Sequence, residues 1–85
     1  MSYRVVLGRV AKRDLQRLDR VWQRRVVKHL QTLIDAPRPS GVVKLRGAEN
    51  EWRIRVGDYR IIYEIDDDKS LVTILRIRHR RQAYR

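Results

Sequence analysis

Cysteine and phenylalanine are absent from this chain of 85 residues, and glycine and proline are scarce. Without cysteine there are no disulfides and no thiolate metal sites, so a hydrophobic core or a binding partner must stabilise the fold. No apolar run is long enough to form a signal peptide or to span a bilayer. We therefore expect one small intracellular domain over residues 1–85, with no membrane segment.

Acidic residues are the other shortage. Asp and Glu total 10 against 21 Lys and Arg, which gives a net charge of +11. A domain built only for solubility intersperses the two signs and keeps its net charge modest. An excess this large is typical of proteins that bind nucleic acid or a strongly acidic protein. Most of the positive charge is arginine, whose planar guanidinium suits bidentate contacts to phosphate.

The first half of the chain predicts a strand followed by two short helices. Residues 2–7 are rich in β-branched side chains, which favours a strand. Within residues 9–19 the apolar positions follow a helical period at Ala11, Leu15 and Leu18. Asp19 can cap a second helix, whose apolar face is formed by Trp22, Val26, His29, Leu30 and Leu33. The prolines and glycine of residues 35–41 end this helical hairpin.

The second half of the chain has the alternating pattern of β-strands. Four strands are predicted, at residues 42–45, 51–56, 59–65 and 71–77. The resulting order is β-α-α-β-β-β-β. We expect an α+β domain in which the two-helix hairpin packs on one face of a twisted, mostly antiparallel sheet.

The central hairpin carries a pair of like charges that a stable sheet does not need. Gly57 and Asp58 form a two-residue loop that favours a type II′ turn and sets Arg55 opposite Arg60. Like charges in opposed positions destabilise a sheet by a few tenths of a kcal/mol up to about 1. Arg53 shares their face because strand side chains alternate. A solvated sheet surface is one interpretation; an anion site is favoured because more arginines are expected on the neighbouring strand, namely Arg76, Arg78, Arg80 and Arg81.

These motifs resemble a known family. The segments "KLRG", "EWRIRVGDYRIIYEI" and "VTILRIRHRRQAYR" together are similar to the RelE/ParE superfamily of bacterial type II toxins, and more to its RelE branch. The resemblance implies a ribosome-dependent endoribonuclease that cleaves mRNA in the cytoplasm of a bacterium or archaeon. It implies no metal and no cofactor. It also implies a cognate acidic antitoxin that holds the toxin inactive.

The resemblance assigns roles by position in the motifs. Arg60, Arg80 and Tyr84 are the expected catalytic residues. The expected substrate-binding residues are Lys44, Arg46, Arg53, Arg55, Arg78 and Arg81. Arg78 stands where family members usually have glycine, and the pair on the first hairpin strand is Arg-Arg where lysines are common. Neither departure removes a positive charge, so both bear on substrate preference more than on activity.

Cleaving RNA without a metal sets three tasks: a base for the attacking 2′-hydroxyl, cations for the extra negative charge, and an acid for the leaving oxygen. Arginines suit the second task but are poor proton shuttles. Tyr84 fits two roles, a base whose phenolate the arginines stabilise or a platform on which an RNA base stacks. We expect a structural role for His79 and an interior, hydrogen-bonded position for His29. Glu49 and Glu51 are weaker candidates for proton transfer.

Two further functions remain open at this stage. A ParE-like protein would inhibit DNA gyrase by binding, and the same fold serves both activities. A non-catalytic RNA-binding module would bind RNA with steep salt dependence and leave it intact. A metal site is not expected, because two histidines fifty positions apart and no cysteine make no ligand set.

Overall fold

The computed structural model describes residues 2–47 and 50–83. Its elements are β1 (Arg4–Leu7), α1 (Arg9–Gln16), α2 (Arg20–Thr32), β2 (Val43–Lys44), β3 (Glu51–Val56), β4 (Tyr59–Asp66), β5 (Leu71–His79) and α3 (Arg80–Ala83). This confirms the predicted order of strands and helices and adds one short terminal helix. None of the helices in the described segments combines the length and the apolar character needed to cross a membrane.

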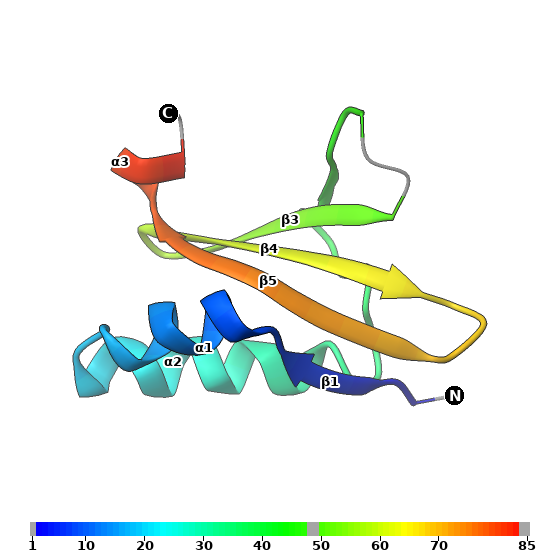
Figure 1. Cartoon of the computed structure of the whole chain (residues 1–85), viewed down its shortest axis with the longest axis horizontal. Coiled ribbons are helices and arrows are strands. Elements are labelled where there is room, and N and C mark those ends of the chain that lie inside the picture. The colour runs from blue at the N-terminus through cyan, green and yellow to red at the C-terminus, as the bar shows by residue number, and fades with distance from the viewer. Residues whose placement is uncertain (1, 48–49, 84–85) are drawn as a thin grey trace.

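The strands form one mixed sheet of five, in the order β1-β5-β4-β3-β2. All neighbouring pairs are antiparallel except β1 and β5, which run parallel. The helices α1 and α2 lie together along one side of the sheet, whereas α3 lies at the end of β5 on the other side (Figure 1). The sheet therefore has a helix-covered face and an open face, and the predicted α+β fold is confirmed.

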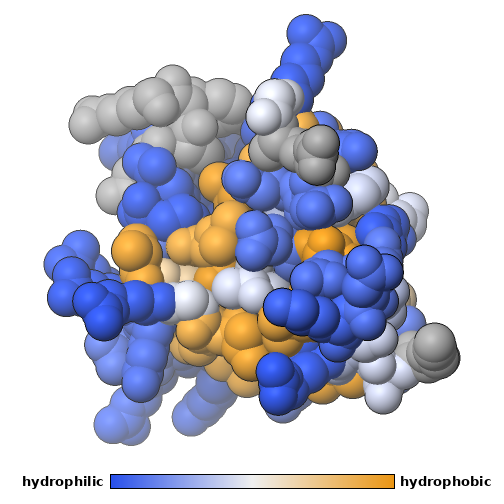
Figure 2. Space-filling view, turned by 45° about the vertical axis from the view of Figure 1, so that its right-hand side comes forward, coloured by the Kyte–Doolittle hydropathy of each residue, from blue (hydrophilic) through white to orange (hydrophobic). Residues whose placement is uncertain are grey.

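The core lies between the helical hairpin and the covered face. The predicted apolar face of α2 supplies three buried side chains, Val26, Leu30 and Leu33. They pack with buried strand residues, which are Ile54, Ile61, Tyr63, Ile65, Val72, Ile74 and Ile77. Burying one such aliphatic side chain contributes about 1.5–3 kcal/mol. Hydrophilic side chains surround the apolar ones on the face that Figure 2 shows.

The two helices meet at a capped junction. α1 ends at Gln16, three residues short of the expected end. Asp19 then adopts an extended backbone, and its Oδ1 accepts a hydrogen bond from the backbone N–H of Trp22 at 3.0 Å. This confirms the predicted cap of α2, a contact that contributes about 1 kcal/mol.

The proline-containing segment after α2 is fixed to the far end of the β4–β5 hairpin. Arg38 pairs with Asp67 at 2.9 Å, and the Tyr3 hydroxyl donates to the same carboxylate at 2.6 Å. The hydrogen bond from Arg38 holds the pKa of Asp67 below its usual range. The buried Tyr63 hydroxyl donates to Pro37 O at 2.8 Å, and burial raises the pKa of Tyr63 to about 12. These contacts close the end of the sheet opposite α3.

Candidate anion site on the open face of the sheet

A row of three arginines crosses the open face. Arg55 on β3 lies opposite Arg60 on β4, as the sequence predicts, and Arg60 in turn lies opposite Arg78 on β5. The adjacent row, one position along each strand, contains the buried core residues Ile54, Ile61 and Ile77. Because successive side chains point to opposite faces, the arginine row projects away from the helices.

The turn that sets this register has the predicted geometry. Gly57 has a φ of +57°, and Asp58 is not among the residues with positive φ. A type I′ turn needs positive φ at both central residues, whereas type II′ needs it only at the first. The turn is therefore type II′, and the pairing of Arg55 with Arg60 follows from it.

One member of the arginine row is buried. Arg60 is only 8% exposed although both of its cross-strand neighbours are arginines. Like charges in opposed positions destabilise a sheet by a few tenths of a kcal/mol up to about 1. The buried Nε of Arg78 has no hydrogen-bond partner among the described residues. A phosphate on this face would supply both the negative charge and the acceptor oxygens.

The row opens into a hollow beside α3. The hollow has a volume of about 440 Å³ and is lined by Arg55, Arg60, Arg80 and Arg81. The expected place of Arg80 and Arg81 on the last strand is wrong, because β5 ends at His79 and both residues begin α3. The backbone N–H of Arg80 donates to Asp58 O at 2.7 Å. This bond fixes the start of α3 beside the hairpin turn, so the last strand and its helix enclose one side of the hollow.

The other expected binding residues lie outside the hollow. Arg53 is half-buried on the open face, opposite Val43 and Ile62. Lys44 lies opposite Trp52, which places it on the helix side of the sheet, with its Nζ 5.8 Å from the Trp52 ring centroid. Arg46 is exposed in the turn after β2.

Of the candidates for proton transfer, Tyr84 and Glu49 lie outside the described residues. Glu51 begins β3 opposite Glu64, at the end of the hairpin away from the hollow. His79 lies opposite Tyr59 on the helix side, with the two rings 5.4 Å apart and edge to face. That position fits the structural role predicted for His79.

β5 contains a bulge that the sequence analysis missed. Tyr63 pairs with Ile74 but Ile61 pairs with Ile77, so Leu75 is an extra residue in β5. Unbroken alternation along residues 71–77 would place Leu75 on the same face as Ile77, but the register shift interrupts this alternation at Leu75. The signal was present in the spacing of apolar residues, which changes from two to three between Ile74 and Ile77.

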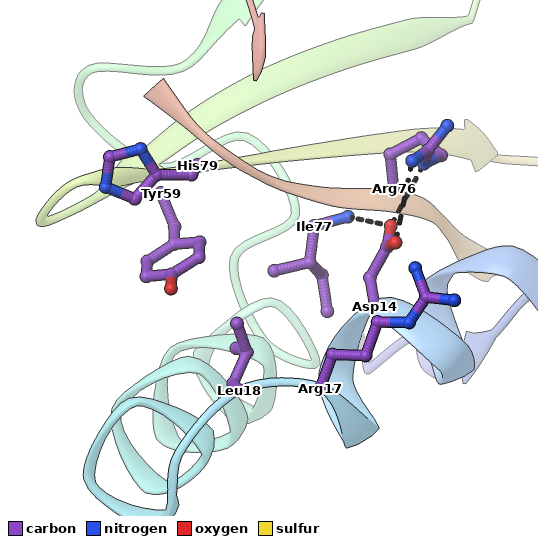
Figure 3. Close-up of a pocket in the computed structure, with 7 residues that line it drawn as sticks. All are labelled: Asp14, Arg17, Leu18, Tyr59, Arg76, Ile77 and His79. Carbon is purple, nitrogen blue, oxygen red and sulfur yellow. Dashed lines mark hydrogen bonds and ion pairs between the residues drawn. The ribbon is translucent and has the colours of Figure 1, made fainter. Parts of the chain in front are cut away.

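Arg76 does not join the arginine row. Its Nε lies 3.0 Å from Asp14 Oδ2 on α1, so its guanidinium is paired at the edge of the sheet (Figure 3). The expectation that Arg76 converges on the anion site is wrong. These residues line a second hollow of about 350 Å³, which also includes Arg17, Leu18, Tyr59, Ile77 and His79.

His29 departs from the sequence analysis as well. It lies half-buried on α2, as expected for the apolar face. Its Nε2 is buried and has no hydrogen-bond partner in the described segments, so the expected hydrogen bond is absent there. Nor do three or more His, Asp or Glu side chains gather into a metal-binding group within residues 2–47 and 50–83.

Comparison with known proteins adds to this geometry. A family model described as the ParE toxin of the type II toxin-antitoxin system parDE matches residues 5–84. Toxin RelG of Mycobacterium tuberculosis is 35% identical over 100% of this chain and 99% of its own length. Toxin RelE of the same organism is 34% identical over 98% of this chain and 87% of its own length. The archaeal RelE–RelB complex from Pyrococcus horikoshii OT3 contains a chain with a TM-score of 0.83 and 32% identity, over 94% of this chain and 97% of that one.

Proposed function

Because this chain belongs to the RelE/ParE superfamily of type II toxins and its relatives are RelE-like, we propose that it is a ribosome-dependent endoribonuclease that cleaves mRNA without a metal ion. The observation that carries the proposal is the cross-strand arginine row, Arg55, Arg60 and Arg78, of which Arg60 is buried, beside a hollow lined by four arginines. A row of like charges lowers the stability of a sheet, so its presence favours a role in binding phosphate.

The proposed reaction is an internal transfer at phosphorus. The 2′-oxygen of one nucleotide forms a bond to the adjacent phosphorus while the bond from phosphorus to the 5′-oxygen breaks. The proton of the 2′-hydroxyl passes to a base, and an acid supplies a proton to the leaving 5′-oxygen. The products are a 2′,3′-cyclic phosphate and a 5′-hydroxyl. The transition state carries extra negative charge on phosphorus oxygens, which is the charge that fixed cations stabilise.

Arg60 and Arg80 are the proposed contacts to the scissile phosphate. Arg60 is held by its strand and by burial, so its guanidinium is pre-positioned and loses little side-chain freedom on binding. Arg80 begins α3 and is fixed through its backbone bond to Asp58. Arg55 and Arg81 complete the hollow and bind flanking phosphate oxygens.

The remaining expected residues form an outer path for RNA. Arg53 and Arg78 extend the open face on either side of Arg60, and Arg46 lies further along beyond β2. Lys44 is proposed to contact RNA that passes around the β2 edge, because it faces the helix side. Tyr84 keeps both of its proposed roles, as base or as stacking platform for the substrate.

The proposed partner in the cell is an acidic antitoxin. The related structure from Pyrococcus horikoshii is a RelE–RelB complex. A net charge of +11 on this chain supports binding of an acidic segment that becomes ordered on contact. Such a segment would neutralise the arginines that we assign to mRNA.

The proposal is tested by mapping new mRNA 5′ ends on translating ribosomes. The parent chain should produce them, and Arg60→Ala should reduce cleavage by a factor on the order of 10²–10³, as for loss of one transition-state donor. Lys69→Ala is the matched control, because it removes one positive charge from the exposed β4–β5 turn and should cleave as the parent does.

A DNA gyrase supercoiling assay on the same three proteins tests the alternative that the ParE description of the family model suggests. Gyrase inhibition by the parent without new 5′ ends would replace the nuclease proposal. If the parent binds RNA but neither cleaves mRNA nor inhibits gyrase, the protein is a non-catalytic RNA-binding module. Full cleavage by the Arg60→Ala variant would refute the role assigned to Arg60.

A further inference from the structure

The bulge in β5 decides which face presents Arg78. From Ile74 onward, regular alternation would turn Ile77 to the open face and Arg78 to the helix side. With one extra residue at Leu75, Ile77 is instead buried opposite Ile61, and Arg78 faces the open side. The anion site therefore depends on keeping the bulge in place.

The bulged part of β5 has no strand along its outer edge. β1 pairs with β5 no further than Ile74. Beyond that point Asp14 of α1 takes the place of a strand: its Oδ2 accepts from the backbone N–H of Ile77 at 2.9 Å and from Arg76 Nε at 3.0 Å. Figure 3 shows the carboxylate of Asp14 directed at this edge. Its side chain is only 12% exposed, so water competes little for these bonds.

α1 is itself fixed against β5. Gly8 N donates to Ile74 O at 2.8 Å immediately before the helix begins. A Cβ on Gly8 would lie 3.0 Å from the same oxygen, so the helix start is in close contact with the strand. These backbone contacts set the distance between Asp14 and the bulge. We call the two hydrogen bonds that the Asp14 carboxylate accepts from residues 76 and 77 the Asp14 clamp.

We propose that Asp14 is a positioning residue for RNA cleavage, and the proposal rests on the proposed function. Asp14 does not line the arginine hollow. It acts by holding residues 75–77, so that Arg78 lies opposite Arg60 and the chain continues into α3 with Arg80 N on Asp58 O. Releasing the clamp would let the end of β5 and the start of α3 shift relative to Arg60.

The test compares three variants in single-turnover cleavage on programmed ribosomes. In Asp14→Ala the cleavage rate constant at saturation should fall on the order of tenfold to a hundredfold, because small displacements of catalytic groups have effects of this size. The half-saturating concentration should change little, since no binding group is removed. Asp14→Asn keeps an acceptor oxygen for Ile77 N–H and should fall between parent and Asp14→Ala.

Arg76→Ala is the matched control. It removes the partner of the carboxylate but leaves the bond from Ile77 N–H to Asp14, so it should cleave at the parental rate. Circular dichroism at the assay temperature excludes global unfolding. Asp14→Asn, which keeps the size of the side chain, serves if Asp14→Ala does not fold.

Amide hydrogen exchange and cross-strand nuclear Overhauser effects provide a readout that needs no RNA. In Asp14→Ala and Asp14→Asn, protection of the Ile77 amide should fall and the cross-strand contacts between Tyr59 and His79 should weaken. Unchanged protection and unchanged contacts would overturn the proposal, and so would their loss with an unchanged cleavage rate. If the parent itself does not cleave mRNA, the proposed function fails, and the exchange data still decide whether Asp14 holds β5.

Discussion

Arg55 and Arg60 face each other across the β3–β4 hairpin, and at this pair stability and binding conflict. The proposed phosphate site needs positive charge, whereas the sheet would be more stable with opposite charges. Arg55 partly relieves the conflict by donating from its Nε to Gly57 O at 3.0 Å, which directs the side chain along the turn. Arg60 is buried and lies between Arg55 and Arg78.

Replacing Arg55 by glutamate should have opposite effects on the stability of the sheet and on the proposed cleavage of mRNA. Arg55→Glu places a carboxylate opposite Arg60, so the free energy of unfolding should rise by about 0.2–1 kcal/mol. Cleavage of mRNA should fall, because a negative charge then lines the hollow. Urea denaturation and 5′-end mapping measure the two effects.

Arg53→Glu is the control for this substitution. It changes the net charge by the same amount, but Arg53 lies opposite Val43 and Ile62 and gains no cationic partner. An equal rise in stability in both variants would show that overall charge, and not the cross-strand pair, is responsible.

At the scale of elements, the β3–β4 turn and the N-terminal end of α2 are in direct contact. A Cβ on Gly57 would overlap the indole ring of Trp22 at Cη2. Trp22 packs against Tyr59 with ring centroids 5.0 Å apart, and Tyr59 contacts His79. One aromatic cluster thus joins the helical hairpin to the end of the sheet from which α3 begins.

Gly57→Ala should therefore destabilise the protein in two ways. Positive φ costs a residue with a side chain about 1–2 kcal/mol, and the contact with Trp22 adds overpacking of about 1–3 kcal/mol. Gly41→Ala isolates the first effect, because Gly41 has a φ of +88° with no atom within 4 Å of the added Cβ. The comparison uses free energies of unfolding in urea, and equal losses in the two variants would contradict the role given to Trp22.

The terminal helix α3 is the element that the proposed chemistry needs and the core does not. Among the described residues the last member of the core is Ile77, so a chain ending at His79 should keep most of its free energy of unfolding. It should lose cleavage, since Arg80 and Arg81 line the hollow. A second truncation that removes only residues 84–85 separates α3 from Tyr84. Thermal unfolding and 5′-end mapping are the measurements. Cleavage of mRNA by the chain ending at His79 would show that residues 80–85 are dispensable.

For the whole molecule, the net charge of +11 and the proposed function predict RNA binding that weakens as salt concentration rises. Each phosphate contact to a single strand contributes about −0.7 to the slope of log affinity against log salt concentration. Arg60→Ala should make the slope shallower by about that amount. Lys69→Ala should leave it unchanged, because Lys69 lies in the turn at the far end of β4 and β5.

Fluorescence anisotropy of a short labelled RNA over a series of salt concentrations gives the slope. Equal slopes for the parent and for Arg60→Ala would mean that Arg60 makes no phosphate contact. If Arg60→Ala binds RNA more weakly but with the parental slope, the loss of affinity comes from lost side-chain packing and not from a lost phosphate contact.

The order of elements from β1 to β5, the apolar face of α2 and the register of the central hairpin could all be predicted from the sequence alone. Each depends on local rules: apolar spacing, the cap at Asp19, and a two-residue turn with glycine first. The pairing of Arg55 with Arg60 followed from that turn, because a hairpin loop of known length fixes which residues meet. The excess of arginine likewise pointed to a polyanion without any structure.

Only the tertiary structure decided how the C-terminal residues are distributed around that hairpin. The bulge at Leu75 is stabilised by Asp14, which is 63 positions from Ile77 in sequence. The same carboxylate removes Arg76 from the arginine row. The bond from Arg80 N–H to Asp58 O places α3, and pairing of Lys44 with Trp52 directs Lys44 away from the hollow. Such contacts join segments that no local pattern relates, so they exist only once the chain has folded.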